Sequence, residues 1–182
     1  NKVGVKYNDK VFQRINQKEN SYVLGVFRKY DSAISPESPH VVLVNPSDMG
    51  NLGTTMRTLV GFGIKNLVLI TPTADIWNPK TIRASMGAIF HIQFQHFGGI
   101  VQYKEQFPKH HMYSFMLDGN LELKPENFQK DDLYCLVFGN EANGLDDSYS
   151  DFSTSVRIPQ SGLVDSLNLS IAVAVGAYVF TL

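Results

Sequence analysis

Short apolar runs alternate with amphipathic segments over most of the chain. From residue 40 onward, several apolar runs are each closed by proline, glycine or a polar turn, which is typical of buried strands. Between them, apolar side chains recur at helical spacing. The predicted strands are His40–Asn45, Asn66–Ile70, Ile89–Phe94, Met112–Leu117 and Leu133–Phe138, and the predicted helices are Asn51–Phe62, Pro79–Gly87 and Gly98–Phe107. Strand, helix, strand at this spacing predicts an α/β fold, a parallel sheet flanked by helices.

The last part of the chain, Val156–Phe180, combines three patterns. A short apolar segment ends at Pro159, a polar turn follows, and an almost uncharged helical pattern runs over Leu167–Phe180. Two roles are open for the polar residues at the start of this helix. Asp165 or Ser166 can be the N-cap of a buried helix, or the unpaired N–H groups of the helix start can help to hold a ligand.

Composition narrows the class of protein. The chain has 182 residues, of which 43% are hydrophobic and 18% charged, and this fits one globular domain with or without an extension. The net charge of −1 gives no global signature of a nucleic-acid binder, although a basic face can exist within a neutral total. The single cysteine, Cys135, excludes an intrachain disulfide and a cysteine metal cluster. With no recognisable signal peptide or membrane span, we expect a cytoplasmic protein with no membrane or metal partner.

The first 39 residues differ from the rest in composition. Lysine and arginine alternate with tyrosine and phenylalanine up to Tyr30, a mixture that can bind RNA through phosphate contacts and stacking or can be an ordinary solvated extension. Ser32–Pro39 is interpreted as a linker because it contains two prolines and three serines. The expected organisation is therefore an N-terminal extension and linker over 1–39 and one domain over 40–182.

Three polar loops follow predicted apolar segments, where a parallel sheet places its ligands. In the first, 45–57, Asn51 can cap the next helix, and Arg57 is either a pocket residue or a surface arginine. In the second, 139–146, Glu141 stands between two glycines. Glu141 is interpreted as a ligand contact, as a partner of a cation such as Arg57, or as part of an exposed turn. The third loop is the polar turn before the C-terminal helix.

Other candidate chemistry is weaker. The chain has no G-x-G-x-x-G fingerprint, P-loop lysine or G-x-S-x-G nucleophile elbow. The histidines lack metal-ligand spacing, and His110–His111 is expected in a solvated turn. Arg83 and Ser85, near the end of a short predicted helix, can hold a phosphate or can simply belong to a helix C-terminus.

Taken together, the loops resemble the three motifs of the SpoU/TrmH family, which are RNA ribose 2′-O-methyltransferases of the SPOUT class. The matching segments are Asn51-Leu52-Gly53 with Arg57, Leu136–Glu141 with Gly144-Leu145, Ile158-Pro159 with Ser166–Asn168, and RASMGA at 83–88. They occur in the family's order, and the resemblance covers residues 41–182. Two positions depart from the family pattern: Ala142 stands where glycine is usual, and Gln160 stands where methionine is common.

The resemblance implies properties that the residue pattern does not show. It implies a SPOUT fold with a C-terminal trefoil knot, a homodimer, and an enzyme: an RNA (ribose-2′-O-)-methyltransferase that uses S-adenosyl-L-methionine on structured rRNA or tRNA. The implied catalytic residues are Arg57, Asn51, Glu141, Ser166 and Asn168. The implied cofactor-binding residues are Gly139, Asn140, Ile158, Gln160 and Leu167. Arg83 and Ser85 are candidates for RNA binding.

Alternatives to this function are open. A non-catalytic RNA-binding or ribosome-assembly protein on the same fold would lose cofactor binding. A nicotinamide-dependent oxidoreductase needs a glycine fingerprint after the first strand, which this chain lacks. An unknotted small-molecule methyltransferase would be expected to carry a glycine-rich loop there, and the first loop does not match. Within the resemblance, Arg57 is expected either to act as a base or, because arginine normally stays protonated, to stabilise negative charge.

Overall fold

Two units make up the chain, Asn1–Tyr30 and Asp31–Leu182, and the computed structural model describes residues 10, 14, 25–30, 32–128 and 133–182. All of the described residues of the first unit are exposed. Apart from Lys10 and Arg14, the basic and aromatic residues up to position 24 that were expected to contact RNA lie outside the described residues.

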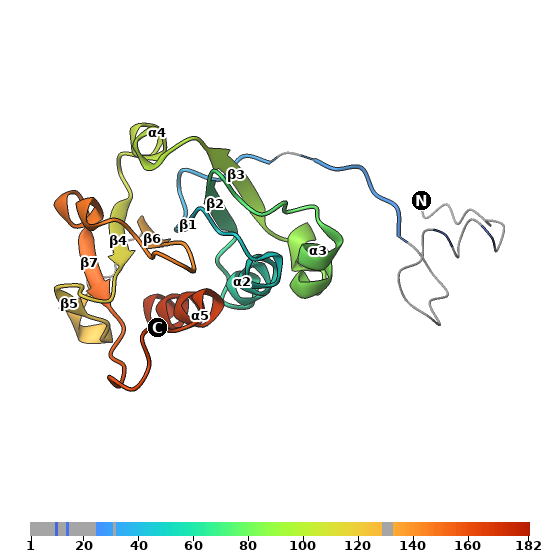
Figure 1. Ribbon diagram of the computed structural model, residues 1–182. Helices are drawn as coiled ribbons and strands as arrows, with labels where there is room; N and C mark the ends of the chain where they lie inside the picture. The colour runs from blue at the N-terminus through green and yellow to red at the C-terminus, as the bar shows by residue number, and fades with distance from the viewer. Residues whose placement is uncertain (1–9, 11–13, 15–24, 31, 129–132) are drawn as a thin grey trace. The chain divides into compact units, whose positions relative to one another are not determined.

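The second unit is built on a seven-stranded sheet in which every pair of neighbouring strands is parallel (Figure 1). The strands are β1 (His40–Val44), β2 (Asn66–Ile70), β3 (Gln93–Phe97), β4 (His111–Phe115), β5 (Leu121–Glu122), β6 (Tyr134–Phe138) and β7 (Thr154–Arg157). Their order across the sheet is β3-β2-β1-β6-β4-β7-β5. The central strands β2 and β6 are buried along their whole length, which explains their continuous apolar sequences. The predicted parallel sheet is confirmed.

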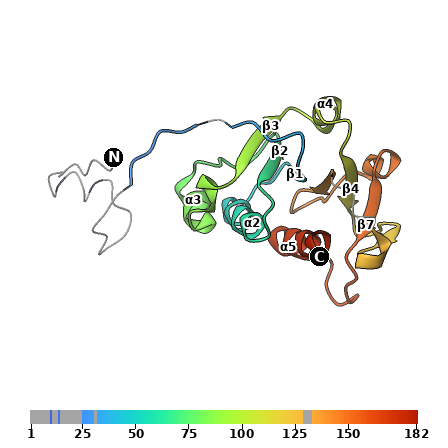
Figure 2. The same cartoon turned by 180° about the vertical axis from the view of Figure 1, so that it is seen from behind.

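Helices cover both faces of the sheet (Figures 1 and 2). On one face, α2 (Met49–Gly61) lies between α3 (Pro79–Ser85) and α5 (Leu169–Thr181) and contacts both. On the other face, α4 (Ile100–Gln106) packs Tyr103 into a second apolar cluster. In the described part of the chain, no helix is long and apolar enough to cross a membrane.

A glycine sets the distance between α2 and α3. A Cβ atom on Gly53 would collide with the Thr81 carbonyl oxygen and would lie 2.6 Å from the Ala84 Cβ. Only the absence of a side chain at this position lets the two helices approach so closely. The two helices therefore pack as one layer, and their outer sides form a continuous surface.

Most predicted elements lie within two residues of the observed ones, and the third strand is the exception. The prediction placed it at Ile89–Phe94, but Ala88–Phe90 is a 3-10 turn and β3 occupies Gln93–Phe97. Ile89 lies in this turn but is fully buried, like a strand residue of the core. Its apolar side chain therefore made the predicted strand begin too early in the sequence. The two-residue strand β5 was not predicted, because so short a segment carries no periodicity.

Ser32–Pro39, expected to be a linker, forms hydrogen bonds with the sheet. Ser32 Oγ donates to the Phe94 carbonyl at 2.9 Å and accepts from the Phe94 N–H at 2.7 Å. The Ser35 N–H donates to Asn66 Oδ1 at 2.9 Å, and Ile34 is buried in the second apolar cluster. This segment is therefore an ordered strap along the edge of the sheet at which the strands begin.

Two stacked histidines hold the strap. The rings of His40 and His110 lie 4.0 Å apart between centroids, and both side chains are buried. His40 Nε2 donates to the Ser35 carbonyl at 2.8 Å, and His110 Nε2 donates to the Ser38 carbonyl at 2.9 Å. Since a carbonyl only accepts, His40 is protonated on Nε2, and its Nδ1 accepts from the Tyr103 hydroxyl at 2.8 Å. The predicted solvated turn at His110 is thus wrong.

Stability is expected to depend on the protonation of His40. Burial, opposed in part by the Ser35 carbonyl, lowers the pKa of His40 to about 4. The pKa of a histidine in an unfolded chain is about 6.5. Between these two pKa values, the unfolded state therefore binds more protons than the folded state. The contribution of His40 to stability is complete above the upper pKa and is lost as the pH falls toward the lower one. From pH 7 to 5, the loss due to His40 is about 2 kcal/mol. Urea unfolding at both pH values measures it, and His40→Gln should remove this part of the pH dependence. An unchanged pH dependence would contradict the assignment.

Candidate active site

The carboxyl ends of β1 and β6 lie side by side, because these strands pair in the middle of the sheet. From this pair, β2 and β3 continue to one side and β4 and β7 to the other, so the loops diverge at a switch point of the kind that binds ligands in α/β sheets. The two loops contact each other here. Asn140 Nδ2 donates to the carbonyl of Asn45 at 2.7 Å, and Asn45 itself has a left-handed backbone (φ 50°).

The loop after β6 closes on itself. Asn140 and Gly144 exchange two backbone hydrogen bonds, of 3.2 and 2.9 Å. A Cβ atom on Gly139 would collide with the backbone of Gly144, so this position requires glycine. Ala142, where the family pattern has glycine, is exposed and is not among the described residues with positive φ, so the backbone accommodates alanine there.

The carboxylate of Glu141 joins this loop to the loop after β1. Its Oε2 accepts from the Ser47 N–H at 3.1 Å and from the Ser47 Oγ at 2.9 Å. Its Oε1 accepts from the Asp48 N–H and from Asn51 Nδ2, both at 3.2 Å. Burial alone would raise the pKa of Glu141, but these hydrogen bonds outweigh it and lower the pKa, so the carboxylate is ionised at neutral pH. Of the roles left open for Glu141 by the sequence, an ion pair with Arg57 does not occur among the described residues.

The network continues from Asn51 into the third loop. Asn51 Oδ1 accepts from Asn168 Nδ2 at 3.0 Å. Asn168 Oδ1 in turn accepts from the Ser170 N–H at 2.9 Å and from the Ser170 Oγ at 2.7 Å, which caps the start of α5. The three loops selected in the sequence are therefore connected by side-chain hydrogen bonds through Glu141, Asn51 and Asn168.

Both helix caps in this region differ from the sequence prediction. The N-cap of α2 is Asp48, whose Oδ1 accepts from the Asn51 N–H at 2.7 Å, so Asn51 lies within the first turn and its side chain is available to the network. The N-cap of α5 is Asn168. Asp165 and Ser166 both lie before the helix and are exposed. In both cases, the helix begins after the residue whose side-chain oxygen accepts a hydrogen bond from a backbone N–H group of the first turn.

A pocket of about 430 Å³ lies at the carboxyl ends of β4, β6 and β7. Seven of the predicted site residues line it: Gly139, Asn140, Glu141, Ile158, Gln160, Ser166 and Leu167. Asn51 and Asn168 are not among the lining residues, and they act on the pocket only through the loops that they hold. The volume is in the range of small-molecule sites.

Sequence reasoning missed part of the pocket wall. Met116, Leu117 and Asp118 follow β4, and Asp147 follows the loop after β6. Only Asp118 carried the signal that selected the other loops, a polar residue directly after a predicted strand, because Met116 and Leu117 lie within the predicted strand. The charged residues of the pocket lining are Asp118, Glu141 and Asp147, with no lysine, arginine or histidine among the described lining residues. This wall favours a cationic ligand.

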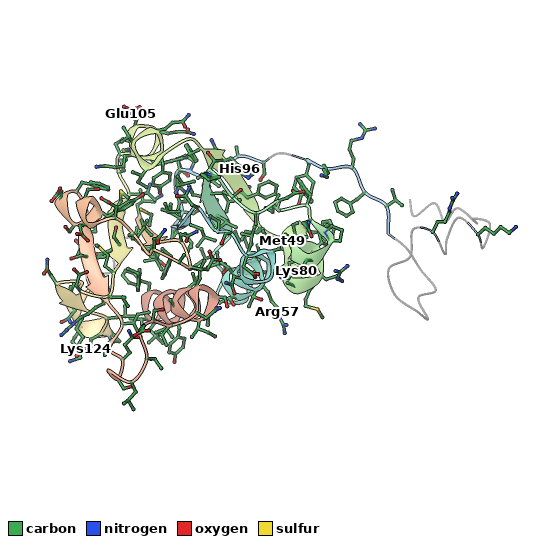
Figure 3. All side chains as sticks on the ribbon, viewed as in Figure 1. Met49, Arg57, Lys80, His96, Glu105 and Lys124 are labelled. Carbon is green, nitrogen blue, oxygen red and sulfur yellow. The ribbon has the colours of Figure 1, made fainter. Side chains whose placement is uncertain are left out.

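Arg57 does not reach the pocket. It is the ninth residue of α2, is exposed, and points away from the sheet (Figure 3). Within the described part of the chain, its guanidinium forms no hydrogen bond or salt bridge, and it is absent from the pocket lining. Arg57 follows the network residue Asn51 by six residues, which at about 3.6 residues per turn is about 1.7 turns, so it projects from a different side of α2.

The two candidates for RNA binding face in different directions. Arg83 is exposed on α3. Ser85 is fully buried, and its hydroxyl donates to the Ile82 carbonyl at 2.8 Å, so its side chain serves the end of α3 and faces away from solvent.

A larger hollow of about 1000 Å³ lies at the opposite edge of the sheet, where the strands begin. It contains none of the predicted site residues. Its lining includes Lys104, whose Nζ lies 4.1 Å from the ring centroid of Phe152, and His111, whose Nε2 lies 2.8 Å from Thr154 Oγ1. No cluster of three or more metal-ligating side chains occurs in the described residues, here or at the active-site pocket.

Comparisons with known proteins agree with this geometry. The model of the SpoU rRNA Methylase family matches residues 38–178. The 23S rRNA (guanosine(2553)-2′-O)-methyltransferase RlmP of Bacillus subtilis is 29% identical over 134 residues, which are 72% of this chain and 53% of that protein. The chain spans about half the length of the curated relatives that it matches.

Several solved structures with this fold share more than 25% sequence identity with this chain. The AdoMet-bound rRNA methyltransferase of Sinorhizobium meliloti superposes with a TM-score of 0.84 at 28% identity, over 95% of this chain and 69% of that chain. A protein solved in connection with the 2-OH methylation of C/U34 on tRNA superposes with a TM-score of 0.71 at 30% identity, over 79% of this chain and 94% of that chain.

Replacing the charge of Glu141 is expected to loosen the junction of the loops. Glu141→Gln keeps the shape but offers one acceptor oxygen to four donors, so we expect about 1–2 kcal/mol lower stability. The amide hydrogens of Ser47 and Asp48 should exchange faster with solvent in the variant, as measured by hydrogen–deuterium exchange. Glu105→Gln, at an exposed position on α4 (Figure 3), is the matched control and should change neither quantity. Unaltered exchange at Ser47 and Asp48 would contradict the role of Glu141.

Proposed function

Because the chain belongs to the SpoU rRNA methylase family, we propose that it transfers a methyl group from S-adenosyl-L-methionine to a ribose 2′-hydroxyl of structured RNA, either rRNA or tRNA. The observation that carries this proposal is the network through Glu141, Asn51 and Asn168, which holds three loops around one pocket. The relatives' names support the reaction class, since one is a 23S rRNA 2′-O-methyltransferase.

The pocket fits this cofactor in size and charge. S-adenosyl-L-methionine supplies a methyl group on a positively charged sulfur. The acidic side chains of Asp118, Glu141 and Asp147 favour that charge at the pocket wall. Gly139 lines the pocket without a side chain, so its backbone groups are accessible to a ligand there. We assign cofactor binding to Gly139, Asn140, Ile158, Gln160 and Leu167.

Glu141 acts in this proposal as a positioning residue. Both of its oxygens already accept hydrogen bonds from the loop after β1 and from Asn51, so it holds the site in shape and does not take the hydroxyl proton. Asn51 and Asn168 have the same positioning role, and the exposed Ser166 lies at the pocket mouth where the ribose would enter. Fixing two reactants in this way lowers the entropic part of the barrier.

Arg57 is assigned the electrostatic role. With S-adenosyl-L-methionine bound, attack of the 2′-oxygen on the methyl carbon would form the O–C bond and break the S–C bond, and the hydroxyl proton would pass to solvent water. A guanidinium stays charged throughout and stabilises negative charge on the oxygen or on a neighbouring phosphate. The exposure of Arg57 on α2 suits a group that meets RNA and not the cofactor.

The proposed assembly is a homodimer. Ile171 and Tyr178 on α5 are each more than half exposed, and the ring of Tyr178 lies 5.9 Å from the ring of Phe62 of α2 in a tilted arrangement. An apolar surface of this kind suits the face of a second subunit. In the same proposal, the basic and aromatic residues before the strap contribute to RNA binding, the rest of the chain forms the SPOUT domain with its C-terminal trefoil knot, and the protein works in the cytoplasm.

The direct test maps 2′-O-methylated nucleotides in rRNA and tRNA from cells with and without the gene. Loss of one or a few sites without the gene supports the proposal and names the substrate. If no site is lost and calorimetry detects no binding of S-adenosyl-L-methionine, the protein is instead a non-catalytic RNA-binding protein on this fold.

Replacing Arg57 is expected to separate catalysis from cofactor binding. Arg57→Ala should lower the methylation rate by about 10²–10³-fold, because a cation that stabilises the transition state is lost. The affinity for S-adenosyl-L-methionine, measured by calorimetry, should stay within about twofold, since Arg57 lies outside the pocket lining. Lys109→Ala, at an exposed position on the opposite edge, is the control for charge removal. Normal turnover by the Arg57 variant would refute the assigned role.

Adding one methyl group at Gly139 is expected to weaken cofactor binding. In Gly139→Ala, the new Cβ would collide with Gly144, so the loop must move away from the pocket. We expect at least about a tenfold weaker affinity for S-adenosyl-L-methionine in calorimetry, with the far-ultraviolet circular dichroism preserved. Gly61→Ala is the matched control, because a Cβ there meets nothing within 4 Å. Equal affinities of the two variants would count against the pocket.

A further inference from the structure

The outer surface of α2 and α3 is basic, whereas the chain as a whole is almost neutral. The whole chain has 16 basic and 17 acidic residues. The two helices together carry three cations, Arg57, Lys80 and Arg83, and no aspartate or glutamate. A local basic surface within an almost neutral protein indicates an anionic partner.

The three cations share one surface because of how the helices pack. Gly53 brings α2 and α3 into close contact, and Thr81 and Ser85 point into the interior. Lys80 and Arg83 are exposed and three residues apart on α3, which places them on the same side of that helix. Figure 3 shows Arg57 and Lys80 on this side of the molecule.

This surface begins at the active site. Lys80 Nζ forms an ion pair with Asp48 Oδ2 at 3.2 Å, and the Asp48 N–H donates to Glu141 Oε1 at 3.2 Å. Lys80 is therefore connected through a single residue to the carboxylate that holds the loops together. An RNA strand whose ribose enters the pocket would pass α3 with its neighbouring nucleotides.

Large apolar side chains lie exposed beyond the end of α3. Met86, in a left-handed conformation, is 73% exposed, and Phe90 is 51% exposed. They follow Arg83 by three and seven residues. An exposed aromatic ring next to cations on a short stretch of surface matches the way in which proteins bind single-stranded nucleic acid, with phosphate contacts and base stacking.

We propose that the α2–α3 face, made of Arg57, Lys80, Arg83, Met86 and Phe90, docks a single-stranded segment of the substrate RNA next to the methylated ribose. Lys80 and Arg83 bind phosphates, and Phe90 stacks on a base. The proposal rests on the proposed methyltransferase function, because it assumes that the ribose of the same RNA enters the pocket.

The test uses the full chain and a fluorescein-labelled single-stranded RNA oligonucleotide, with fluorescence anisotropy measured over a series of KCl concentrations. Arg83→Gln and Lys80→Gln should each weaken RNA binding several-fold and reduce the slope of log affinity against log salt by about 0.7, as expected for one lost phosphate contact to a single strand. Phe90→Ala should weaken binding about tenfold with an unchanged salt slope, because stacking is uncharged. Lys109→Gln, on the opposite edge, should change neither quantity.

Two further measurements separate the possible outcomes. Calorimetry with S-adenosyl-L-methionine should give the wild-type affinity for all four variants, which shows that they fold and that the pocket is intact. If the wild type binds no cofactor, the proposed function fails, whatever the RNA result. If the cofactor binds but the α2–α3 variants bind RNA like the wild type, the docking surface is wrong. It is also wrong if these variants instead dissociate a dimer in sedimentation analysis, because the face would then be a subunit interface.

Discussion

The carboxylate of Glu141 holds the active site together, since the loops around the pocket have no sheet pairing with one another. It accepts four hydrogen bonds from Ser47, Asp48 and Asn51, and Asn51 passes the connection on to Asn168 at the start of α5. These partners lie 90 to 94 residues from Glu141, and Asn168 lies 117 residues from Asn51. Hydrogen bonds to an ionised group are stronger than neutral ones, so one side chain orders segments that are distant in sequence.

The pocket and the α2–α3 face carry charges of opposite sign. The charged residues that line the pocket are all acidic, which suits the proposed cationic cofactor, and the charged residues of α2 and α3 are all basic, which suits the proposed RNA substrate. Asp48 stands between the two regions, with its side chain on Lys80 and its N–H on Glu141. The net charge of −1 averages over both regions and therefore conceals each of them.

Polar groups are stabilised differently at the two ends of the strands. At the carboxyl edge, an ionised Glu141 collects N–H donors and remains in partial contact with water. At the other edge, His40 and His110 are buried as neutral rings, each donating to a carbonyl of the strap. A neutral donor suits this edge, because a buried charge without a partner would cost far more than a neutral hydrogen-bonded ring.

The sequence by itself determined the elements and the three loops, because strand and helix periodicities are local and because polar residues after apolar strands mark the ligand edge of a parallel sheet. It selected Glu141, Asn51 and Asn168, yet it left the partner of Glu141 open and put the helix caps at the wrong residues. It also gave no sign of the strap, of the buried histidines, or of Asp118 in the pocket wall. Only the tertiary structure decided these points, since hydrogen-bond partners, burial and the facing of a side chain depend on residues that are remote along the chain.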